Sequence, residues 1–277
     1  MIPTVSIIIP CYNGERWVGE AIRSVKIQTY PYIQTIVVND GSTDGSVNEI
    51  RKWENVMLIN HEKNRGVCCA ANTGFDAATS TYAGILAADD VYIDPEHISR
   101  QVREMERHNL DWCYNSCNLR GETLQTATKA KAAWLTPPVR HAAHIFRYLD
   151  NVILMYPRIC YLLSGIRNPV NSSTMMIRMK TYKNKKLSWN PWDLKSVCDG
   201  GLIATMFLNG LKCRAIPECD AFYRIHKDQI SNKPINSIAM KDLVNNMYSD
   251  TVLRDQPIWM KISANLIKSY LTRRSRR

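Results

Sequence analysis

The chain opens with two short apolar runs that flank a segment of helical periodicity. Residues 5–10 and 35–38 are almost wholly apolar and rich in β-branched side chains, as in strands buried on both faces of a parallel sheet. Between them apolar residues recur at helical spacing until Pro31, which predicts a helix that ends there. The order predicts a strand–helix–strand unit. Its two loops, 10–14 and 39–45, would leave neighbouring strand ends, where α/β sheets bind ligands.

The same alternation continues through the next part of the chain and predicts three more strands and three more helices. The strands are expected at residues 56–59, 82–86 and 112–114. The helices are expected at 45–53, at 67–78 and from Asp94 onward, where Asp94 is a good N-cap and Pro95 suits a first turn. We therefore expect an α/β domain with a mostly parallel central sheet flanked by helices.

The second half of the chain is less regular. Residues 121–168 show no clear pattern, whereas residues 168–178 form a loop that enters a strand. A helix at 199–209 and strands at 212–216 and 222–226 follow. Beyond residue 237 the last helical stretch is amphipathic and ends in arginines. Its apolar face comprises Trp259, Ile262, Leu266 and Tyr270. Its basic end comprises Arg273, Arg274, Arg276 and Arg277.

The composition limits the class of protein. With 277 residues and 45% hydrophobic residues, the chain can form one large globular domain or two small ones. The net charge of +11 fits a solvated basic face, a diphosphate ligand or an anionic membrane surface. Two clusters carry much of it: Lys180, Lys183, Lys185 and Lys186, and the terminal arginines. Neither cluster alternates with aromatic residues as nucleic-acid-binding motifs do, so we expect no nucleic acid partner.

The cysteines and the apolar runs predict a location. None of the nine cysteines forms a CxxC pair or a zinc pattern, which favours a reducing compartment. No apolar run is long enough to cross a membrane, and the amino terminus leads directly into a strand rather than a signal peptide. We expect a cytoplasmic protein. Its amphipathic, basic tail would be either a helix packed on the domain or a peripheral contact with anionic lipid.

Several motifs in order resemble those of the family 2 glycosyltransferases. They are IIIPCYNG and IVVNDGSTD near the start, an N-x-G…A-x-N-x-G block at 64–74, paired aspartates at 89–90, and Y-R-x-H at 223–226. The resemblance covers about residues 4–95 and 168–231. It implies a GT-A (Rossmann-like) fold with residues 1–115 as the nucleotide-sugar-binding half, 116–231 as the acceptor-binding half of the same domain, and 232–277 as a helical, basic tail.

The function implied by this resemblance is an inverting, metal-dependent glycosyltransferase. It would move a sugar from a nucleoside-diphosphate sugar, with a UDP-sugar favoured, to a glycan or lipid-linked glycan. One alternative is a degenerate relative that binds nucleotide sugar or glycan without turnover. A nucleotidyltransferase is less favoured, because the first strand is not followed by a glycine-rich basic phosphate loop.

The resemblance assigns the nucleotide to one set of residues. These are Pro10, Tyr12, Asn13, Asp40, Asn72 and Asp89. Pro10 and Tyr12 would line the base, since an aromatic ring can stack on it, and Asp40 would accept an N–H of uracil. Asn39 stands where the family often has a second acid, and an amide is both donor and acceptor, so the identity of the base stays open.

The resemblance assigns the metal and the diphosphate to the end of the fourth strand and to the Y-R-x-H motif. Asp89, Asp90 and His226 would hold Mn²⁺ or Mg²⁺, which suit oxygen ligands. Arg224 would offset the charge of the diphosphate. The family usually has D-x-D-D at this strand end, whereas Ala87 replaces the first aspartate here.

Asp199 is the candidate general base for the acceptor hydroxyl. The family commonly has E-D at this helix start, and here Cys198 takes the place of the first acid. From the residues alone, an N-cap would be the favoured explanation of Asp199, and the resemblance is what favours the base. The nearby Trp189 and Trp192 are candidate stacking platforms for an acceptor sugar, with core aromatics as the alternative.

Overall fold

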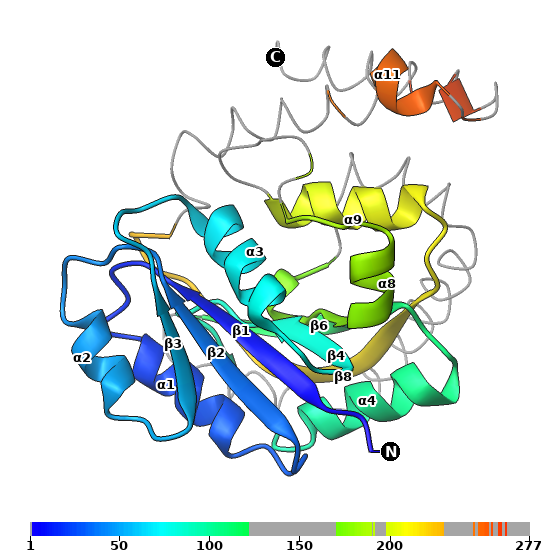
Figure 1. Cartoon of the computed structure of the whole chain (residues 1–277). Coiled ribbons are helices and arrows are strands. Elements are labelled where there is room, and N and C mark those ends of the chain that lie inside the picture. Colours follow the sequence, from blue (N-terminus) through cyan, green and yellow to red (C-terminus); the bar gives the residue numbers. More distant parts are fainter. Residues whose placement is uncertain are drawn as a thin grey trace.

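The computed structural model describes residues 2–121, 170–189, 191 and 198–229, and residues 246, 249–254, 256, 260, 261 and 264 farther on. In this part of the chain eight strands form one sheet, in the order β3-β2-β1-β4-β7-β6-β8-β5. Helices cover both of its faces (Figure 1). The predicted α/β class and mostly parallel sheet are confirmed, because four of the seven strand pairs are parallel.

The first half of the sheet is wholly parallel. Its strands are β1 (Val5–Cys11), β2 (Ile33–Asn39), β3 (Val56–Asn60) and β4 (Tyr82–Ile85). β2 lies between β1 and β3, and β1 also pairs with β4. The predicted strand–helix–strand unit is thus confirmed, and all four strands end at the same edge of the sheet.

The second half of the sheet is mixed. Its strands are β5 (Val91–Tyr92), β6 (Trp112–Gly121), β7 (Met176–Arg178) and β8 (Cys213–Arg224). β7 runs antiparallel to β4 and β6, β8 runs parallel to β6, and β5 runs antiparallel to β8. The predicted boundary between residues 115 and 116 falls inside β6, so the two proposed halves share this strand and one sheet.

The helices form two layers, one on each face of the sheet. One layer holds α1 (Val18–Lys26) and α4 (His97–Arg107), whose apolar faces pack on Ile7, Ile9 and Val37. The other holds α3 (Val67–Ala77), α8 (Met179–Asn184) and α9 (Cys198–Leu208), which pack over Ile8 and Ile36. Two further elements are short. The helix α2 (Ser46–Arg51) follows β2, and the 3₁₀ turn η1 (Ser172–Thr174) directly precedes β7.

The structure corrects three details of the predicted elements. The strands expected at 212–216 and 222–226 are one continuous strand, β8, because the break around Pro217 is absorbed by shifts of register against β6. The helix expected from Asp94 begins at His97, since the Asp94 carboxylate accepts the N–H of Glu96 in a turn before the helix. The two-residue strand β5 was not predicted, because its only signal is its pairing with β8.

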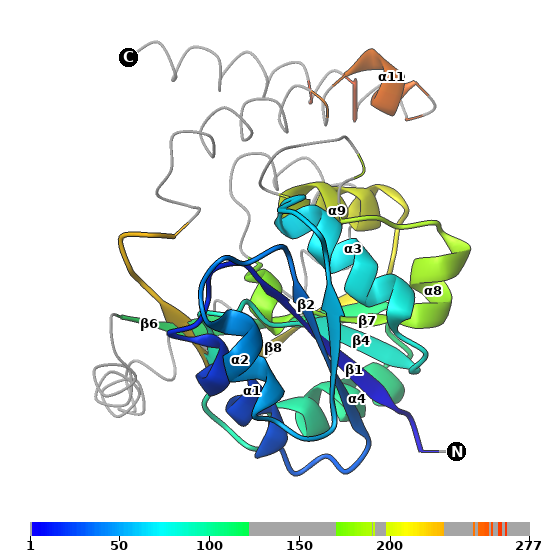
Figure 2. The ribbon, with the colours of Figure 1, turned by 60° about the vertical axis from the view of Figure 1, so that its left-hand side comes forward.

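The tail is described in part. The short helix α11 (Asp250–Leu253) lies on the same side of the sheet as α3 and α9, as Figures 1 and 2 both show. Leu253, Met260 and Ala264 are buried members of the hydrophobic cluster that contains α9. The predicted amphipathic face, the terminal arginines and most of residues 121–168 lie outside the described residues.

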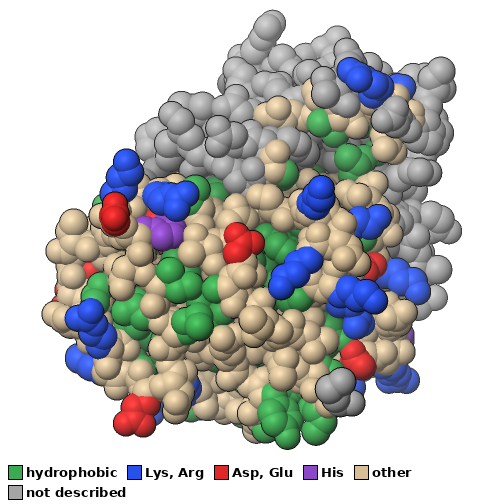
Figure 3. Space-filling model, viewed as in Figure 1, with side chains coloured by type: hydrophobic (Ala, Val, Ile, Leu, Met, Phe, Trp, Pro, Cys, Tyr) green, Lys and Arg blue, Asp and Glu red, His purple; other side chains and the backbone are tan. Residues whose placement is uncertain are grey.

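Lysines form an exposed basic patch beside α8. Lys180 and Lys183 lie in this helix, and Lys185 and Lys186 directly follow it. Figure 3 shows Lys and Arg side chains gathered on this side of the molecule, where α8 lies in Figure 1. No helix among the described residues is long and apolar enough to cross a membrane.

Candidate active site

The carboxyl ends of β1, β2 and β4 bring three segments together. The loop after β1 touches the turn after β4: a Cβ added to Gly14 would lie 3.6 Å from the Cβ of Ala88. The loop after β2 is equally close to that after β1, since the N–H of Asp40 donates to the carbonyl of Cys11 over 2.8 Å. The predicted nucleotide and metal segments therefore share one edge of the sheet.

Side chains tie the loops after β1 and β2 to each other. The N–H of Asn13 donates to Ser42 Oγ (2.9 Å), and Asn13 Oδ1 accepts the N–H of Thr43 (2.8 Å). The N–H of Gly14 donates to Ser46 Oγ over 2.8 Å. Asn13 thus joins the two loops, and its contact with a nucleotide stays a prediction. The neighbouring Tyr12 is 48% exposed, so its ring is open to a ligand.

Asp40 is buried and its carboxylate is occupied by protein. Oδ1 lies 2.7 Å from His61 Nδ1 and accepts the N–H of Arg65 over 3.0 Å. Oδ2 accepts the N–H of Gly66 over 2.8 Å. The structure gives Asp40 the role of holding the segment before α3, and its contact with a nucleobase stays a prediction. His61 was not predicted from the sequence as part of the site. Its other ring nitrogen, Nε2, lies 3.0 Å from Thr73 Oγ1 on α3.

Asn72 and Trp189 belong to a contact between α3 and the segment after α8. Asn72 Oδ1 accepts the N–H of Trp189 over 2.9 Å, and Asn72 Nδ2 donates to Ser188 Oγ over 3.2 Å. Trp189 is only 1% exposed and its ring lies 5.3 Å from that of Phe75. The prediction that Trp189 stacks on an acceptor sugar is therefore wrong: it is a core residue. Trp192 lies outside the described residues.

Asp89 and His226 form the accessible part of the site. Asp89 Oδ2 lies 2.9 Å from His226 Nε2, and the two side chains are 27% and 18% exposed. The imidazole also packs at 5.7 Å from the ring of Trp17, which begins the first turn leading into α1. The structure thus brings together two of the three predicted metal ligands, one from the end of β4 and one from the segment after β8.

Asp90, directly behind this pair, is 1% exposed. Its Oδ2 accepts the hydroxyl of Ser173 over 2.5 Å, and its Oδ1 accepts the N–H of Arg224 over 3.1 Å. Burial and the adjacent negative charge of Asp89 raise the pKa of Asp90 to about 8, although these two hydrogen bonds oppose the shift. Ser173 was not predicted, because nothing in the sequence links it to a residue so far away.

Arg224 makes its contacts with protein. Its Nε donates to the carbonyl of Asp89 over 2.9 Å, and its terminal nitrogen lies 2.5 Å from Glu20 Oε2. The guanidinium lies 4.3 Å from the ring centre of Trp17. With 4% exposure, Arg224 holds the turn of Asp89, and its predicted contact with a diphosphate stays a prediction. Glu20 and Trp17 were missed, because helical spacing explained Trp17 as a core residue.

The donor set fits a divalent cation in part. Among the described residues no group of three or more His, Cys, Asp or Glu side chains is placed to hold a metal ion. Asp89 and His226 nevertheless supply a carboxylate oxygen and an imidazole nitrogen at one accessible point, which suits Mn²⁺ or Mg²⁺ with water or phosphate as further ligands. Burial is the main cause of the raised pKa of Asp90 and the negative charge of Asp89 is the second, and a cation bound beside them would favour the ionised carboxylate.

Asp199 lies in the first turn of α9 and its known contact is local. Its Oδ1 accepts the N–H of Gly200 over 2.8 Å. Burial raises the pKa of this carboxyl, and the backbone hydrogen bond partly opposes that shift. In the described ranges no hydrogen bond joins Asp199 to Asp89, Asp90 or His226. Its role as a base stays a prediction.

Curated proteins similar to this chain are glycosyltransferases. An uncharacterised glycosyltransferase of Haemophilus influenzae is 28% identical over 244 residues, which cover 83% of this chain and 68% of that protein. EpsJ of Bacillus subtilis, also an uncharacterised glycosyltransferase, is 40% identical over 114 residues. That match covers 40% of this chain and 33% of EpsJ, so the chain spans only a third of this relative.

Solved structures show the same fold. S. aureus TarS in complex with UDP-GlcNAc superposes with a TM-score of 0.68 at 17% identity, over 96% of this chain and 70% of that chain. The mannosyltransferase PcManGT of Pyrobaculum calidifontis, in complex with GDP-Man and Mn²⁺, superposes with a TM-score of 0.62 at 14% identity. The match covers 96% of this chain and 74% of that chain. The predicted GT-A fold is confirmed. Residues 6–177, more than half of the chain, match the family described as glycosyl transferase family 2, and the chain therefore belongs to that family.

Proposed function

We propose that this protein is a glycosyltransferase that takes a sugar from a nucleoside-diphosphate sugar in the presence of a divalent cation. The observation that carries the proposal is the accessible Asp89–His226 pair, which lies with the buried Asp90 at the strand edge beside the loop after β1. Membership of glycosyl transferase family 2 supports it. The ligands of the neighbours, UDP-GlcNAc in TarS and GDP-Man with Mn²⁺ in PcManGT, support it further.

The donor would bind across the loops after β1 and β2. Tyr12 is the exposed ring at this edge, and it would stack on the base beside Pro10. A UDP-sugar is favoured, although the neighbours include both uridine and guanosine complexes. Asp89 and His226 would hold Mn²⁺ or Mg²⁺, whose charge would stabilise the departing diphosphate. Asp90 would hold this turn in place through Ser173 and Arg224.

Asp199 would remove the proton from the acceptor hydroxyl. A carboxyl with a raised pKa is a stronger base once ionised, which suits this role. Attack by the hydroxyl on the face opposite the diphosphate is a single displacement, so the anomeric configuration would invert. The acceptor would be a glycan or a lipid-linked glycan, and an anionic membrane surface would be a further partner through the basic tail.

A protein that binds nucleotide sugar without turnover is the second candidate. Ala87 and Cys198 replace two acids of the family pattern, and the remaining Asp90 is buried and bonded to protein. This candidate predicts metal-dependent nucleotide binding and no transfer. The first candidate predicts both metal-dependent nucleotide binding and sugar transfer.

The decisive experiment offers UDP- and GDP-sugars with Mn²⁺ and a set of glycan and lipid-linked acceptors, and measures release of nucleoside diphosphate. We expect metal-dependent release that Asp199→Asn abolishes while donor binding, measured by calorimetry, persists. Asp76→Asn on the exposed face of α3 is the matched control and should leave release unchanged. Release by Asp199→Asn at the rate of the unaltered protein would refute the base assignment, and binding without release in any mixture would favour the second candidate.

A further inference from the structure

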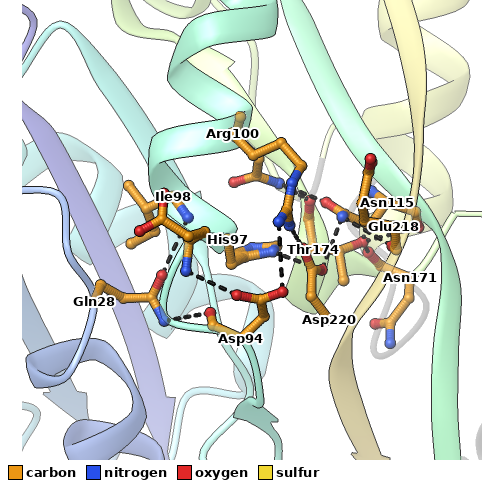
Figure 4. Close-up of polar contacts among 12 residues, drawn as sticks. Gln28, Asp94, His97, Ile98, Arg100, Asn115, Asn171, Thr174, Glu218 and Asp220 are labelled. Atoms are coloured by element: carbon orange, nitrogen blue, oxygen red, sulfur yellow. Dashed lines mark hydrogen bonds and ion pairs between the residues drawn. The ribbon is translucent and has the colours of Figure 1, made fainter. Parts of the chain in front are cut away.

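A buried polar cluster around Asp220 lies behind the candidate site. Asp220, on β8, is 1% exposed and its carboxylate contacts three side chains (Figure 4). Oδ1 lies 2.8 Å from His97 Nδ1 and accepts Asn115 Nδ2 over 2.8 Å, while Oδ2 lies 2.5 Å from a terminal nitrogen of Arg100. Two of these partners come from α4 and one from β6, so a single carboxylate connects three elements.

The cluster extends to the residue beside Ser173. Gln101 Nε2 donates to Asn115 Oδ1 (3.1 Å) and to the carbonyl of Thr174 (2.6 Å). The N–H of Asn115 also donates to Thr174 Oγ1 over 3.3 Å. Thr174 is therefore held by a hydrogen-bonded chain that begins at Asp220. Its neighbour Ser173 donates directly to Asp90.

The second donor to Asp90 lies on the same strand as Asp220. The carbonyl of Asp220 accepts the N–H of Ile93 over 2.8 Å, and β5 pairs with the next residues of β8. The same strand ends at Arg224, whose N–H donates to Asp90. Both donors to Asp90, one on η1 and one on β8, thus lie on elements that Asp220 connects.

We infer that Asp220 is a positioning residue, which holds η1 and the end of β8 so that the Asp89–Asp90 turn keeps its shape. The importance of this turn for activity rests on the proposed function, whereas its shape does not. The chemistry explains why a carboxylate is needed: all three side-chain partners donate, and only a carboxylate accepts at both of its oxygens. Asparagine at position 220 would turn an NH₂ group toward Arg100 or toward His97 and Asn115.

Hydrogen exchange in Asp220→Asn tests this inference. The amides of residues 87–93 report on the turn, because Ala87 donates to Ser173 Oγ and Ile93 to the carbonyl of Asp220. We expect their exchange to accelerate roughly tenfold or more, as for loss of a buried hydrogen bond to a charged group. Asp111→Asn is the control. It removes a carboxylate that accepts Thr181 Oγ1 and the N–H of Lys212 where β6 begins, and should leave residues 87–93 protected.

Two further variants guard against misfolding of Asp220→Asn. Arg100→Met removes one partner of Asp220 and keeps much of the stem, so it should accelerate the same amides to a smaller extent. Ser173→Ala removes the donor at the other end of the chain. If Arg100 and Ser173 act through the same hydrogen-bonded chain, their effects will not add. The amides of residues 87–93 will then exchange no faster in the double variant Arg100→Met, Ser173→Ala than in the more affected single variant.

The outcomes separate this inference from the proposed function. Unchanged protection of residues 87–93, or acceleration spread evenly over the whole molecule, would overturn the positioning role and leave Asp220 a general stabilising residue. If the unaltered protein transfers sugar, the Mn²⁺ concentration for half-maximal rate should also rise severalfold in Asp220→Asn and not in Asp111→Asn. Absence of transfer by the unaltered protein would refute the proposed function, while the exchange result would still decide the inference.

Discussion

Asp89 and Asp90 are neighbours in sequence whose surroundings differ sharply. Asp89 is partly exposed beside His226, whereas Asp90 is buried between Ser173 and Arg224 with its pKa raised to about 8. Adjacent acids in such different environments can take different roles. We therefore expect Asp89 to meet the ligand and Asp90 to keep the turn in place.

Arg224 offers a test at the scale of one side chain. Arg224→Lys keeps the charge but loses the hydrogen bond of Nε to the carbonyl of Asp89 and the contact of the guanidinium with the ring of Trp17. We expect the free energy of unfolding to fall by about 1–3 kcal/mol and sugar transfer to weaken more than tenfold. Urea denaturation and the release assay measure the two effects.

The control for Arg224 lies on the same strand. Arg214 pairs with Glu104 over 3.1 Å but its side chain is 40% exposed, so Arg214→Lys should change stability by no more than about 0.5 kcal/mol. Equal losses in the two variants would show that the contacts of Arg224 with Trp17 and Asp89 contribute nothing special.

Asp199 predicts a pH dependence of activity. A base acts only when ionised, and a raised pKa means that the carboxylate takes up a proton at higher pH than an ordinary aspartate does. Transfer should therefore be lost on acidification at a pH above the ordinary value of about 3.9. The dependence of kcat/KM on pH, with circular dichroism to verify folding at each pH, measures it. If kcat/KM fell only at a pH at or below the ordinary pKa of an aspartate, the prediction would be contradicted.

At the scale of elements, the site is a set of strand ends linked by short hydrogen bonds. The loops after β1 and β2 are joined through Asn13, Ser42 and Ser46, and the segment before α3 is held to β2 by Asp40. Gly41, just after Asp40, has φ +71 and lies against the backbone of Lys63. The geometry of this edge therefore depends on backbone packing as much as on the side chains.

Gly41→Ala should disrupt this edge. A Cβ there would lie 2.5 Å from the carbonyl carbon of Lys63, in a conformation that side chains rarely adopt. We expect stability to fall by about 3 kcal/mol, from strain and overpacking together. Gly210→Ala, at φ +68 with nothing within 4 Å, should cost only about 1 kcal/mol of strain. Thermal unfolding compares the two variants, and similar losses would mean that the contact with Lys63 relaxes freely.

At the scale of the whole molecule, one sheet separates two hydrophobic clusters. The cluster over α1 and α4 lies behind the Asp89–Asp90 turn, and the cluster over α3 and α9 includes residues of the tail. Met260 and Ala264 are fully buried in the second cluster. The tail therefore belongs in part to the folded core, which supports a packed helix for its described residues.

Met260→Ala tests this attachment. Loss of a fully buried methionine should lower the free energy of unfolding by about 2–4 kcal/mol. Met57, in β3, is 45% exposed, and Met57→Ala should cost no more than about 0.5 kcal/mol. A single cooperative urea transition for Met260→Ala, shifted relative to Met57→Ala, would show that tail and sheet unfold together. No shift would mean that the tail is bound loosely.

The parallel half of the sheet could be predicted from the sequence. β1, β2 and β4 are mostly apolar runs, so burial on both faces could be predicted from the local pattern alone. The same pattern placed Tyr12, Asp40 and Asp89 after strand ends, and the resemblance to the family 2 glycosyltransferases assigned their roles. By contrast, β5 and the continuity of β8 depend on pairing between residues far apart in the chain, which periodicity does not record.

The sequence by itself determined the family, the fold class and the edge of the sheet where the candidate site lies, because these depend on local spacing and on motifs. Only the tertiary structure decided which side chains meet there. Trp189 proved to be core, Arg224 turned toward Glu20 and Trp17, and Ser173 reached Asp90 from a distant loop. Such contacts depend on which polar groups are buried together, and burial is a property of the folded chain rather than of any segment.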